Sequence, residues 1–390
     1  MKKVKKMNLF ALAMASSLIL AACATPAAAP KAADAPKAAE APKATEAPAA
    51  AAPAAGKKLR IKLVINGNFG DKSFFDSAKR GLDQMEKEMG YAISTVELGT
   101  DANKWEPGLE DAAANDDYDV LITGTFQMPD YLGKVADKYP NKKFWMFDAG
   151  PDYAGSDPAK KGCKDKCKNV YSILFAQNEG SYVLGYAIGL TLKAKALKGV
   201  EGKEKVGVIG GLDIPVINDF YVGFKQGFKD AGMNPDNVLI QYVGGDNPFF
   251  NPAKGKEIAK AMFAQGAAVV WGVAGASGNG AFAAAVEDKA YGLGVDSDQY
   301  LTIADPAEKA TIVTSMMKNV DNGLFRAAKL DAEGKLTYGT LEKVGIAGDA
   351  VGVAQNENYK KLIPADIQKQ VDEVYAKAKK GEIKFETAFN

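Results

Sequence analysis

The chain has 390 residues, a formal net charge of +1 and no histidine. Without histidine, Ser-His-Asp and Cys-His catalysis and histidine-ligated metal sites are excluded. Lysines and acids are nearly balanced, so the basic surface that nucleic-acid binding requires is not expected. After the first 56 residues, the chain is long enough for two lobes.

The first 22 residues have the pattern of a secretory signal peptide. Four lysines precede an apolar run from Leu9 to Ala22 that is shorter than the ~20 residues needed to span a bilayer. The run ends in LAAC at Cys23 and resembles the lipobox of bacterial lipoproteins, whose cysteine is acylated, for example with palmitate. We therefore expect cleavage before Cys23 and a lipid anchor on the outer face of the cell membrane or in the periplasm. The alternative is an ordinary signal peptide that ends near a cysteine by chance.

Residues 23–56 form a tract rich in Ala, Pro, Lys and Glu, without the apolar periodicity that a core needs. Alternating Pro and Ala favour an extended chain, so we expect a spacer between membrane and globular part. The globular part is expected to divide into a first lobe of 57–172 with 314–337 and a second lobe of 173–313 with 338–390.

Strand-like and helical patterns alternate through the globular part. In the first half, the sequence predicts strands at 59–65, 93–98, 120–123, 143–147 and 170–175, and helices at 72–88, 105–115 and 128–138. In the second half, it predicts strands at 205–209, 238–243, 268–272 and 291–295, and helices at 178–194, 216–231, 253–264, 278–290 and near 318–336. This order is typical of α/β proteins and predicts two doubly wound parallel-sheet lobes joined by a hinge. Ligands bind such sheets at the carboxyl ends of the strands.

The first predicted strand runs into GNFGDKS, residues 67–73. A phosphate-binding P-loop needs four residues between its glycines and Lys-Ser/Thr directly after the second glycine. Here the glycines are too close, and Asp71 stands where a phosphate would lie. Nucleoside triphosphate binding is therefore not expected, and Asp71 or Ser73 is predicted to cap the following helix.

Two later strand ends also carry candidate binding groups. GASGNG, residues 275–280, has the reverse spacing of the dinucleotide fingerprint, and it forms either a tight turn or a close approach to a ligand. Asp296 and Asp298 form a DxD pair that offers too few ligands for a divalent cation, so no metal site is expected. Asp296 is instead predicted to accept hydrogen bonds from a polyhydroxyl ligand, with helix capping as the alternative.

Cys163 and Cys167 lie in the lysine-rich loop GCKDKCK. Outside the cytoplasm, such a pair is permitted to form a small local disulfide. A zinc site is disfavoured because two thiols without histidine do not complete four ligands. No cofactor is expected.

Seven ordered segments carry a resemblance to a known family. They are GDKSFFDSAKRGL (70–82), VADKYPNKKFWMFD (135–148), NEGSYVLGYAIGL (178–190), GGLDIPVINDFYVGFKQGF (210–228), NPAKGKEIA (251–259), GVDSDQY (294–300) and TSMMKNVDNG (314–323). Through them the chain resembles the basic membrane protein family of bacterial lipoproteins, the purine-nucleoside-binding components of ABC importers. The resemblance implies a type I periplasmic-binding-protein fold with three hinge crossings, ABC permease and ATPase partners, and no enzymatic activity. A tethered binding protein needs no second copy, so a monomer is expected.

The resemblance also implies roles for individual residues. Asp296 and Lys318 match the aspartate and lysine that hold the ribose hydroxyls; the carboxylate accepts from two vicinal hydroxyls, and the ammonium donates to the same oxygens. Phe74 matches one aromatic residue that stacks on the base, and Phe249 resembles the second, with neighbouring Phe250 as the alternative. For these phenylalanines, core packing is the competing interpretation.

Two further positions complete the implied site. Gly275 resembles a backbone position that lines the pocket. Asn66 departs from the family, which usually has aspartate there to accept from base nitrogens, whereas an amide both donates and accepts. The ligand is therefore open between purine nucleosides (guanosine, inosine or adenosine) and a riboflavin-type or other small polar molecule.

Two other functions compete with that of an importer component. One is a non-transport sensor or adhesin, and the other is an enzyme that processes nucleosides or glycosides with Asp296 and a second carboxylate.

Overall fold

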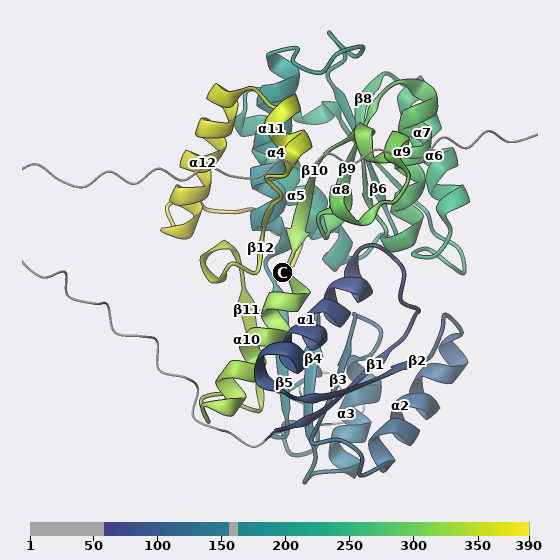
Figure 1. Ribbon diagram of the computed structural model, residues 1–390, viewed down its shortest axis with the longest axis vertical. Coiled ribbons are helices and arrows are strands. Elements are labelled where there is room, and N and C mark those ends of the chain that lie inside the picture. Colours follow the sequence, from purple (N-terminus) through teal and green to yellow (C-terminus); the bar gives the residue numbers. More distant parts are fainter. Residues whose placement is uncertain (1–57, 156–162, 390) are drawn as a thin grey trace, which may run out of the picture. The chain divides into compact units, whose positions relative to one another are not determined.

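The computed structural model describes residues 58–155 and 163–389, which belong to one compact unit of the chain. The predicted signal peptide, Cys23 and the spacer lie outside this part. Two lobes, each a sheet covered by helices, make up the unit (Figure 1). The predicted α/β class with two parallel-sheet lobes is thus confirmed.

The first lobe contains a six-stranded, all-parallel sheet in the order β11-β5-β4-β3-β1-β2. Its strands are β1 (Arg60–Ile65), β2 (Ala92–Glu97), β3 (Val120–Gly124), β4 (Lys143–Phe147), β5 (Val170–Phe175) and β11 (Thr340–Val344). Its helices are α1 (Phe74–Met89), α2 (Trp105–Ala114), α3 (Pro129–Lys138) and α10 (Val320–Ala332), with the 3-10 turn η1 (Ala102–Lys104). Successive side chains of a strand point to opposite faces, so Leu63 and Val64 enter two different apolar clusters.

The second lobe contains a six-stranded sheet in the order β12-β10-β9-β8-β6-β7, in which only β12 is antiparallel to its neighbour. Its strands are β6 (Lys205–Gly210), β7 (Val238–Tyr242), β8 (Ala267–Val273), β9 (Tyr291–Asp296), β10 (Ile312–Lys318) and β12 (Val351–Val353). Its helices are α4 (Gln177–Lys193), α5 (Pro215–Asp230), α6 (Pro252–Ala264), α7 (Gly280–Asp288), α8 (Gln299–Thr302), α9 (Pro306–Thr311), α11 (Glu357–Leu362) and α12 (Ala365–Lys379). Three 3-10 turns complete it: η2 (Pro235–Asn237), η3 (Gly275–Asn279) and η4 (Ile346–Gly348).

Helices α4 and α5 approach each other closely through glycine. A Cβ atom at Gly227 of α5 would lie 2.0 Å from the carbonyl oxygen of Tyr182 in α4, and one at Gly185 of α4 would lie 2.1 Å from that of Phe224. No side chain fits at these distances, so the glycine spacing of the two helices sets how closely they pack. This close packing fixes the position of α5 against α4.

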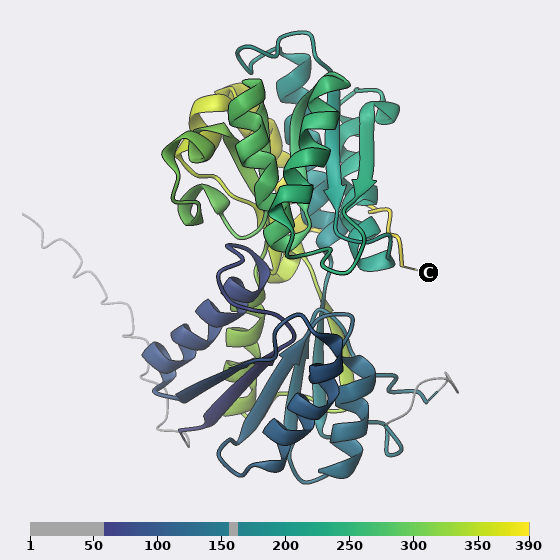
Figure 2. The same ribbon diagram turned by 90° about the vertical axis from the view of Figure 1, so that its right-hand side faces the viewer.

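The chain crosses between the two lobes three times, as the resemblance implies: after β5, after β10 and after β11 (Figure 2). The lobe boundaries differ from the expected ones at two strands. Most of β10, from residue 314 to 318, falls within 314–337, which was expected in the first lobe, but β10 pairs with β9 in the second sheet. β11 falls within 338–390, expected in the second lobe, but pairs with β5 in the first sheet. The reason is that each crossing follows a strand, so the strand stays with the sheet that supplies its hydrogen bonds.

Cys163 and Cys167 are joined by a disulfide in the loop between β4 and β5, and both residues are buried.

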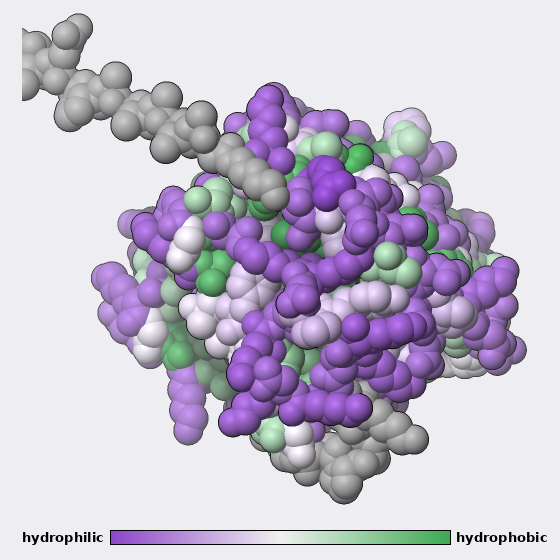
Figure 3. All heavy atoms as spheres, turned by 90° about the horizontal axis from the view of Figure 1, so that it is seen from below, coloured by the Kyte–Doolittle hydropathy of each residue, from purple (hydrophilic) through white to green (hydrophobic). Residues whose placement is uncertain are grey.

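The face seen from below the first lobe is mostly hydrophilic, with apolar residues in small separate areas (Figure 3). Within 58–155 and 163–389, no helix combines the length and apolar character of a membrane span.

Candidate functional site

A pocket lies between the carboxyl ends of the two sheets. Its walls come from the ends of β1, β3 and β4 and the first turn of α1 on one side, and from the ends of β8, β9 and β10 on the other. Parallel strands converge at this edge, which is where open α/β sheets bind ligands. The structure brings all six predicted ligand-contacting residues to this one pocket: Asn66, Phe74, Phe249, Gly275, Asp296 and Lys318.

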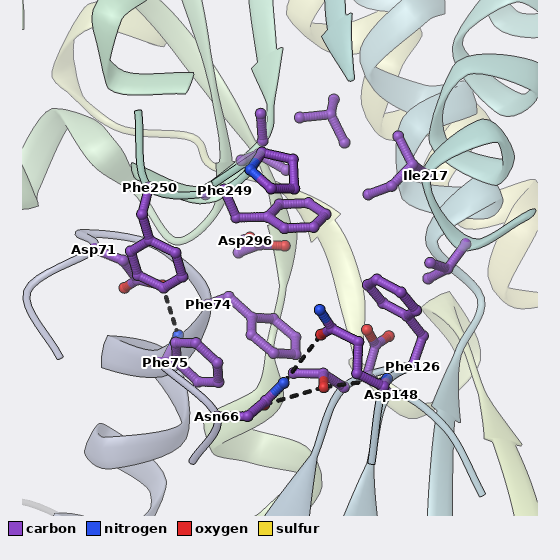
Figure 4. A pocket seen from close by; sticks show the side chains of 18 of the residues that line it. Asn66, Asp71, Phe74, Phe75, Phe126, Asp148, Ile217, Phe249, Phe250 and Asp296 are labelled. Carbon is purple, nitrogen blue, oxygen red and sulfur yellow. Dashed lines mark hydrogen bonds between the residues drawn. The ribbon is translucent and has the colours of Figure 1, made fainter. Parts of the chain in front are cut away.

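Aromatic rings of the two lobes face each other across the pocket (Figure 4). The rings of Phe126 and Phe249 lie 6.2 Å apart and are tilted by 59°. The rings of Phe75 and Phe250 lie 6.4 Å apart and are nearly parallel, at 15°. Both candidates for the second stacking residue, Phe249 and Phe250, therefore line the pocket, each opposite a ring of the first lobe.

A buried ion pair lies in the same pocket. The Lys318 ammonium, at the end of β10, pairs with the Asp148 carboxylate, which directly follows β4. The two side chains are 2% and 9% exposed, and three phenylalanine rings surround the ammonium at 5.2–5.6 Å from their centres. Burial raises the pKa of Asp148, and the positive charge of Lys318 acts against this shift.

Asp296 is held in an unusual conformation at the end of β9. Its φ of 63° is left-handed, a conformation that costs a residue other than glycine about 1–3 kcal/mol. Its Oδ2 accepts a 2.6 Å hydrogen bond from the hydroxyl of Ser73 in the other lobe. Burial raises the pKa of Asp296 to about 6, against the opposing effects of the Lys318 charge and the Ser73 hydrogen bond.

The DxD pair does not act as a unit. Asp298 lies outside the pocket lining, and its Oδ1 accepts from the side-chain amide of Asn356 at 2.7 Å. In the part of the chain that the structure covers, no group of three or more His, Cys, Asp or Glu side chains is arranged to hold a metal ion. Of the two aspartates of the pair, only Asp296 lines the pocket.

Asn66 belongs to a polar network that joins two neighbouring strand ends. Thr125 donates its hydroxyl to Asn66 Oδ1 at 3.1 Å, and Asn66 Nδ2 donates to Gln127 Oε1 at 3.0 Å. β1 lies between β2 and β3, so this network sits where the winding of the sheet reverses direction. The polar wall at this point is therefore made of neutral amide and hydroxyl groups (Figure 4).

The GNFGDKS loop uses its amides within the protein. Two of them donate to the carboxylate of Asp76 at 2.7 and 3.0 Å. The carboxylate of Asp71 accepts from the amide of Ser73, just before α1, and from two amides of the first turn of α1, at 2.9–3.2 Å, so Asp71 caps this helix, as predicted. A phosphate would have to compete with two carboxylates that already occupy these donors.

Sequence reasoning missed several pocket residues. Asp148 directly follows the predicted strand 143–147, and Thr125 and Gln127 lie two and four residues after the predicted strand 120–123. The rule that ligands bind at strand ends would therefore have found them if it had been applied to every strand. Phe220 and Ile217 also line the pocket, from the first turns of α5. No local signal marks them, because apolar residues at helical spacing are typical of core packing.

The fold and the pocket define a class, the two-lobed solute-binding proteins of ABC transporters. A solute-binding protein of an ABC transporter system from Aeropyrum pernix K1 superimposes with a TM-score of 0.70 at 26% identity, covering 85% of this chain and 94% of that one. A corresponding protein from Conexibacter woesei DSM 14684 has a TM-score of 0.65 at 19% identity, covering 85% and 100%, and shares the fold.

Residues 58–387 match the family described as ABC transporter substrate-binding protein PnrA-like, and the chain belongs to this family. The CD4+ T-cell-stimulating antigen of Listeria innocua is 29% identical over 85% of this chain and 88% of its own length. Basic membrane protein A of Borreliella afzelii is 27% identical over 82% and 88%, and an uncharacterized lipoprotein of Pyrococcus abyssi is 27% identical over 85% of each. The resemblance to basic membrane proteins is confirmed, and family and fold are those of substrate-binding proteins rather than enzymes.

Proposed function

We propose that this protein is the lipid-anchored substrate-binding component of an ABC importer. We propose further that it captures a neutral nucleoside and that purine nucleosides are the leading candidates. One observation carries the proposal: facing aromatic rings and a buried group of carboxylates with one ammonium share a single pocket. Aromatic faces suit a planar base, and stacking typically contributes about 1–3 kcal/mol per base. Asp296 and Lys318 suit the vicinal hydroxyls of a ribose, because one accepts and the other donates.

The charge of the pocket favours a ligand without phosphate. Its lining contains four carboxylates, those of Asp71, Asp148, Asp246 and Asp296, and one ammonium, that of Lys318. An anion would meet like charges at short range in a partly desolvated site, where such repulsion is strong. The pocket therefore suits nucleosides better than nucleotides.

The remaining parts of the proposal follow from the family. The ligand is released unchanged to a permease driven by an ATPase, after the lobes have closed on it by rotation about the three crossings. An acylated Cys23 keeps the protein on the extracytoplasmic side of the membrane, next to that permease. The names of relatives, a lipoprotein and a basic membrane protein among them, support this location.

The proposal is tested by thermal unfolding of the purified full-length lipoprotein in detergent. Adenosine, guanosine, inosine, cytidine, uridine, riboflavin, D-ribose and the nucleoside monophosphates are added one at a time. A nucleoside at 100 times its Kd should stabilise the protein by about 2.7 kcal/mol. We expect at least one purine nucleoside to do so and its monophosphate to bind at least tenfold more weakly. A response to riboflavin or ribose without any nucleoside response would refute the ligand assignment.

Nucleoside affinity should weaken below pH 6. The ionised Asp296 is the form that accepts two hydroxyls, and its pKa of about 6 lies above the usual 3.8. At pH 5 only about a tenth of the sites are ionised, so Kd is expected to be about tenfold higher than at pH 8. The folding stability of the ligand-free protein changes with pH in the opposite direction. Because the carboxyl pKa of Asp296 is raised in the folded state, the free energy of unfolding falls as pH rises from about 4 to 6. Calorimetric titration at several pH values measures the first effect.

A further inference from the structure

Three consecutive backbone carbonyls just before α1 accept hydrogen bonds from side chains of the second lobe. The bonds run from Asn279 Nδ2 to the Asp71 carbonyl at 3.2 Å, from Thr302 Oγ1 to the Lys72 carbonyl at 3.1 Å, and from Ser297 Oγ to the Ser73 carbonyl at 2.8 Å. The Ser73 carbonyl accepts in addition the first helical hydrogen bond of α1, from the Ser77 amide at 3.1 Å. Here a short segment of one lobe is bonded, residue by residue, to the other.

The side chain of Ser73 adds a fourth contact, to the proposed ligand-holding residue itself. Its hydroxyl donates to Asp296 Oδ2 at 2.6 Å, and Ser73 is fully buried. An ionised carboxylate offers about four acceptor sites, so Asp296 can accept from Ser73 and from a ligand hydroxyl together. A hydrogen bond to a charged group is about twice as strong as one between neutral groups.

The groups that meet this segment are themselves fixed in place. Gln299 donates its amide to Asn279 Oδ1 at 2.8 Å and accepts from the backbone at Val295 at 3.0 Å. Arg80 of α1 reaches across to the Ser297 hydroxyl at 2.9 Å. Lys72 and Asp296, on the two sides of the contact, both have left-handed φ values, 60° and 63°. Strained conformations of this kind persist only where the surrounding structure holds them, and they are found most often at functional sites.

We propose that residues 71–73 form an interlobe latch and that Ser73 is a positioning residue for Asp296, so that ligand affinity depends on lobe closure. The proposal rests on the proposed function in one respect, namely that Asp296 holds the ligand. Donors and acceptors of the latch belong to different lobes, which are joined covalently only at the three crossings, so lobe rotation separates them. A ligand bound to Asp296 in the open form therefore gains the Ser73 contact only after closure, and its release requires that contact to break first.

Ser73→Ala tests the latch, with Ser77→Ala as the matched control. Ser77 lies four residues further on, in the first turn of α1, and is also fully buried, but its hydroxyl accepts from the Asp321 amide at 3.3 Å, within the first lobe. With guanosine and inosine as probes, stopped-flow binding should show koff raised about tenfold or more in Ser73→Ala and kon within about twofold of the unaltered protein. Ser77→Ala should change neither rate.

The pH profile separates positioning from a merely structural role. The groups that act on Asp296 are Lys318 on β10, Asp148 after β4, Asp71 before α1 and the Ser73 hydroxyl. The hydroxyl favours the ionised carboxylate, so its removal should shift the midpoint of the affinity profile to higher pH. Ser77→Ala should leave the midpoint where it is. An unshifted midpoint together with an unchanged koff in Ser73→Ala overturns the proposal.

A measurement of closure keeps the latch separate from the ligand assignment. Nitroxide labels on Ala102→Cys and Ala253→Cys, exposed residues on different lobes, report the interlobe distance by electron double resonance. The distance is recorded without ligand and with each nucleoside in turn. Loss of short distances in Ser73→Ala but not in Ser77→Ala supports the latch, even if no nucleoside binds and the proposed ligand has to be abandoned. Identical distance distributions in all three proteins under every condition overturn the latch, whatever the ligand is.

Discussion

Replacing Lys318 by methionine is expected to destabilise the ligand-free protein by about 3–5 kcal/mol, the usual cost of removing one partner of a buried ion pair. Methionine fills a similar volume among the surrounding phenylalanine rings, so the loss reports on charge rather than on a cavity. Asp148 is left without its counter-ion, and Asp296 loses the charge that opposes the effect of its burial. Urea unfolding at pH 7.5 measures the change.

Two comparisons make this result specific. Lys260→Met removes an exposed lysine that pairs with Glu287, and such a pair contributes little to folding, so no measurable change is expected. Combining Lys318→Met with Asp148→Asn removes both charges and should restore much of the lost stability. The defect of Lys318→Met should also shrink as pH falls, because the folded protein then takes up a proton on Asp148. A defect that persists in the double variant and at low pH would contradict the electrostatic explanation.

Changing Asp296 to asparagine is expected to abolish most nucleoside binding while leaving the fold intact. Asparagine keeps the size of the side chain and tolerates the left-handed backbone, whereas alanine would add strain. It has no charge and only one acceptor oxygen, so the loss should be about 2–5 kcal/mol, or at least about 30-fold in Kd. Calorimetric titration measures the affinity, and thermal unfolding confirms that the variant is folded.

Asp298→Asn is the natural control for this change. It alters the charge by the same amount two residues away, at a carboxylate bonded to Asn356 outside the pocket. We expect unchanged nucleoside affinity there, and an affinity of Asp296→Asn that no longer varies around pH 6. Equal losses in the two variants would mean that net charge rather than the Asp296 carboxylate determines binding.

Local patterns in the sequence predicted most of the scaffold. The strands 143–147 and 170–175 were located to the residue, because buried parallel strands are short apolar runs bounded by turn residues. The sequence patterns missed three strands, β10, β11 and β12, and four helices, α8, α9, α11 and α12. The three strands lie next to crossings, where the hydrogen-bonding partner decides which sheet a strand joins. Helix 278–290 was predicted as one element, whereas residues 278 and 279 belong to the turn η3 and α7 runs from Gly280 to Asp288.

The site was predictable residue by residue but not pair by pair. Strand-end reasoning and the family resemblance found Asn66, Asp296 and Lys318 as separate candidates. The contacts that give these residues their properties join positions 170 and 223 apart, those of Lys318 with Asp148 and of Ser73 with Asp296. Such pairs follow from the placement of the lobes, which a single sequence does not encode in any local pattern.

The position of Lys318 has a consequence for the order of events in ligand capture. It is the last residue of β10, and α10 begins two residues later in the other lobe. The pocket's ammonium thus lies at one of the pivots of the lobe rotation, and points near a pivot travel least. An arriving ligand meets a cation that is already in place, while walls away from the crossings swing in around it. The Lys318 ammonium thus stays in place during closure, and the other groups of the binding site move toward it.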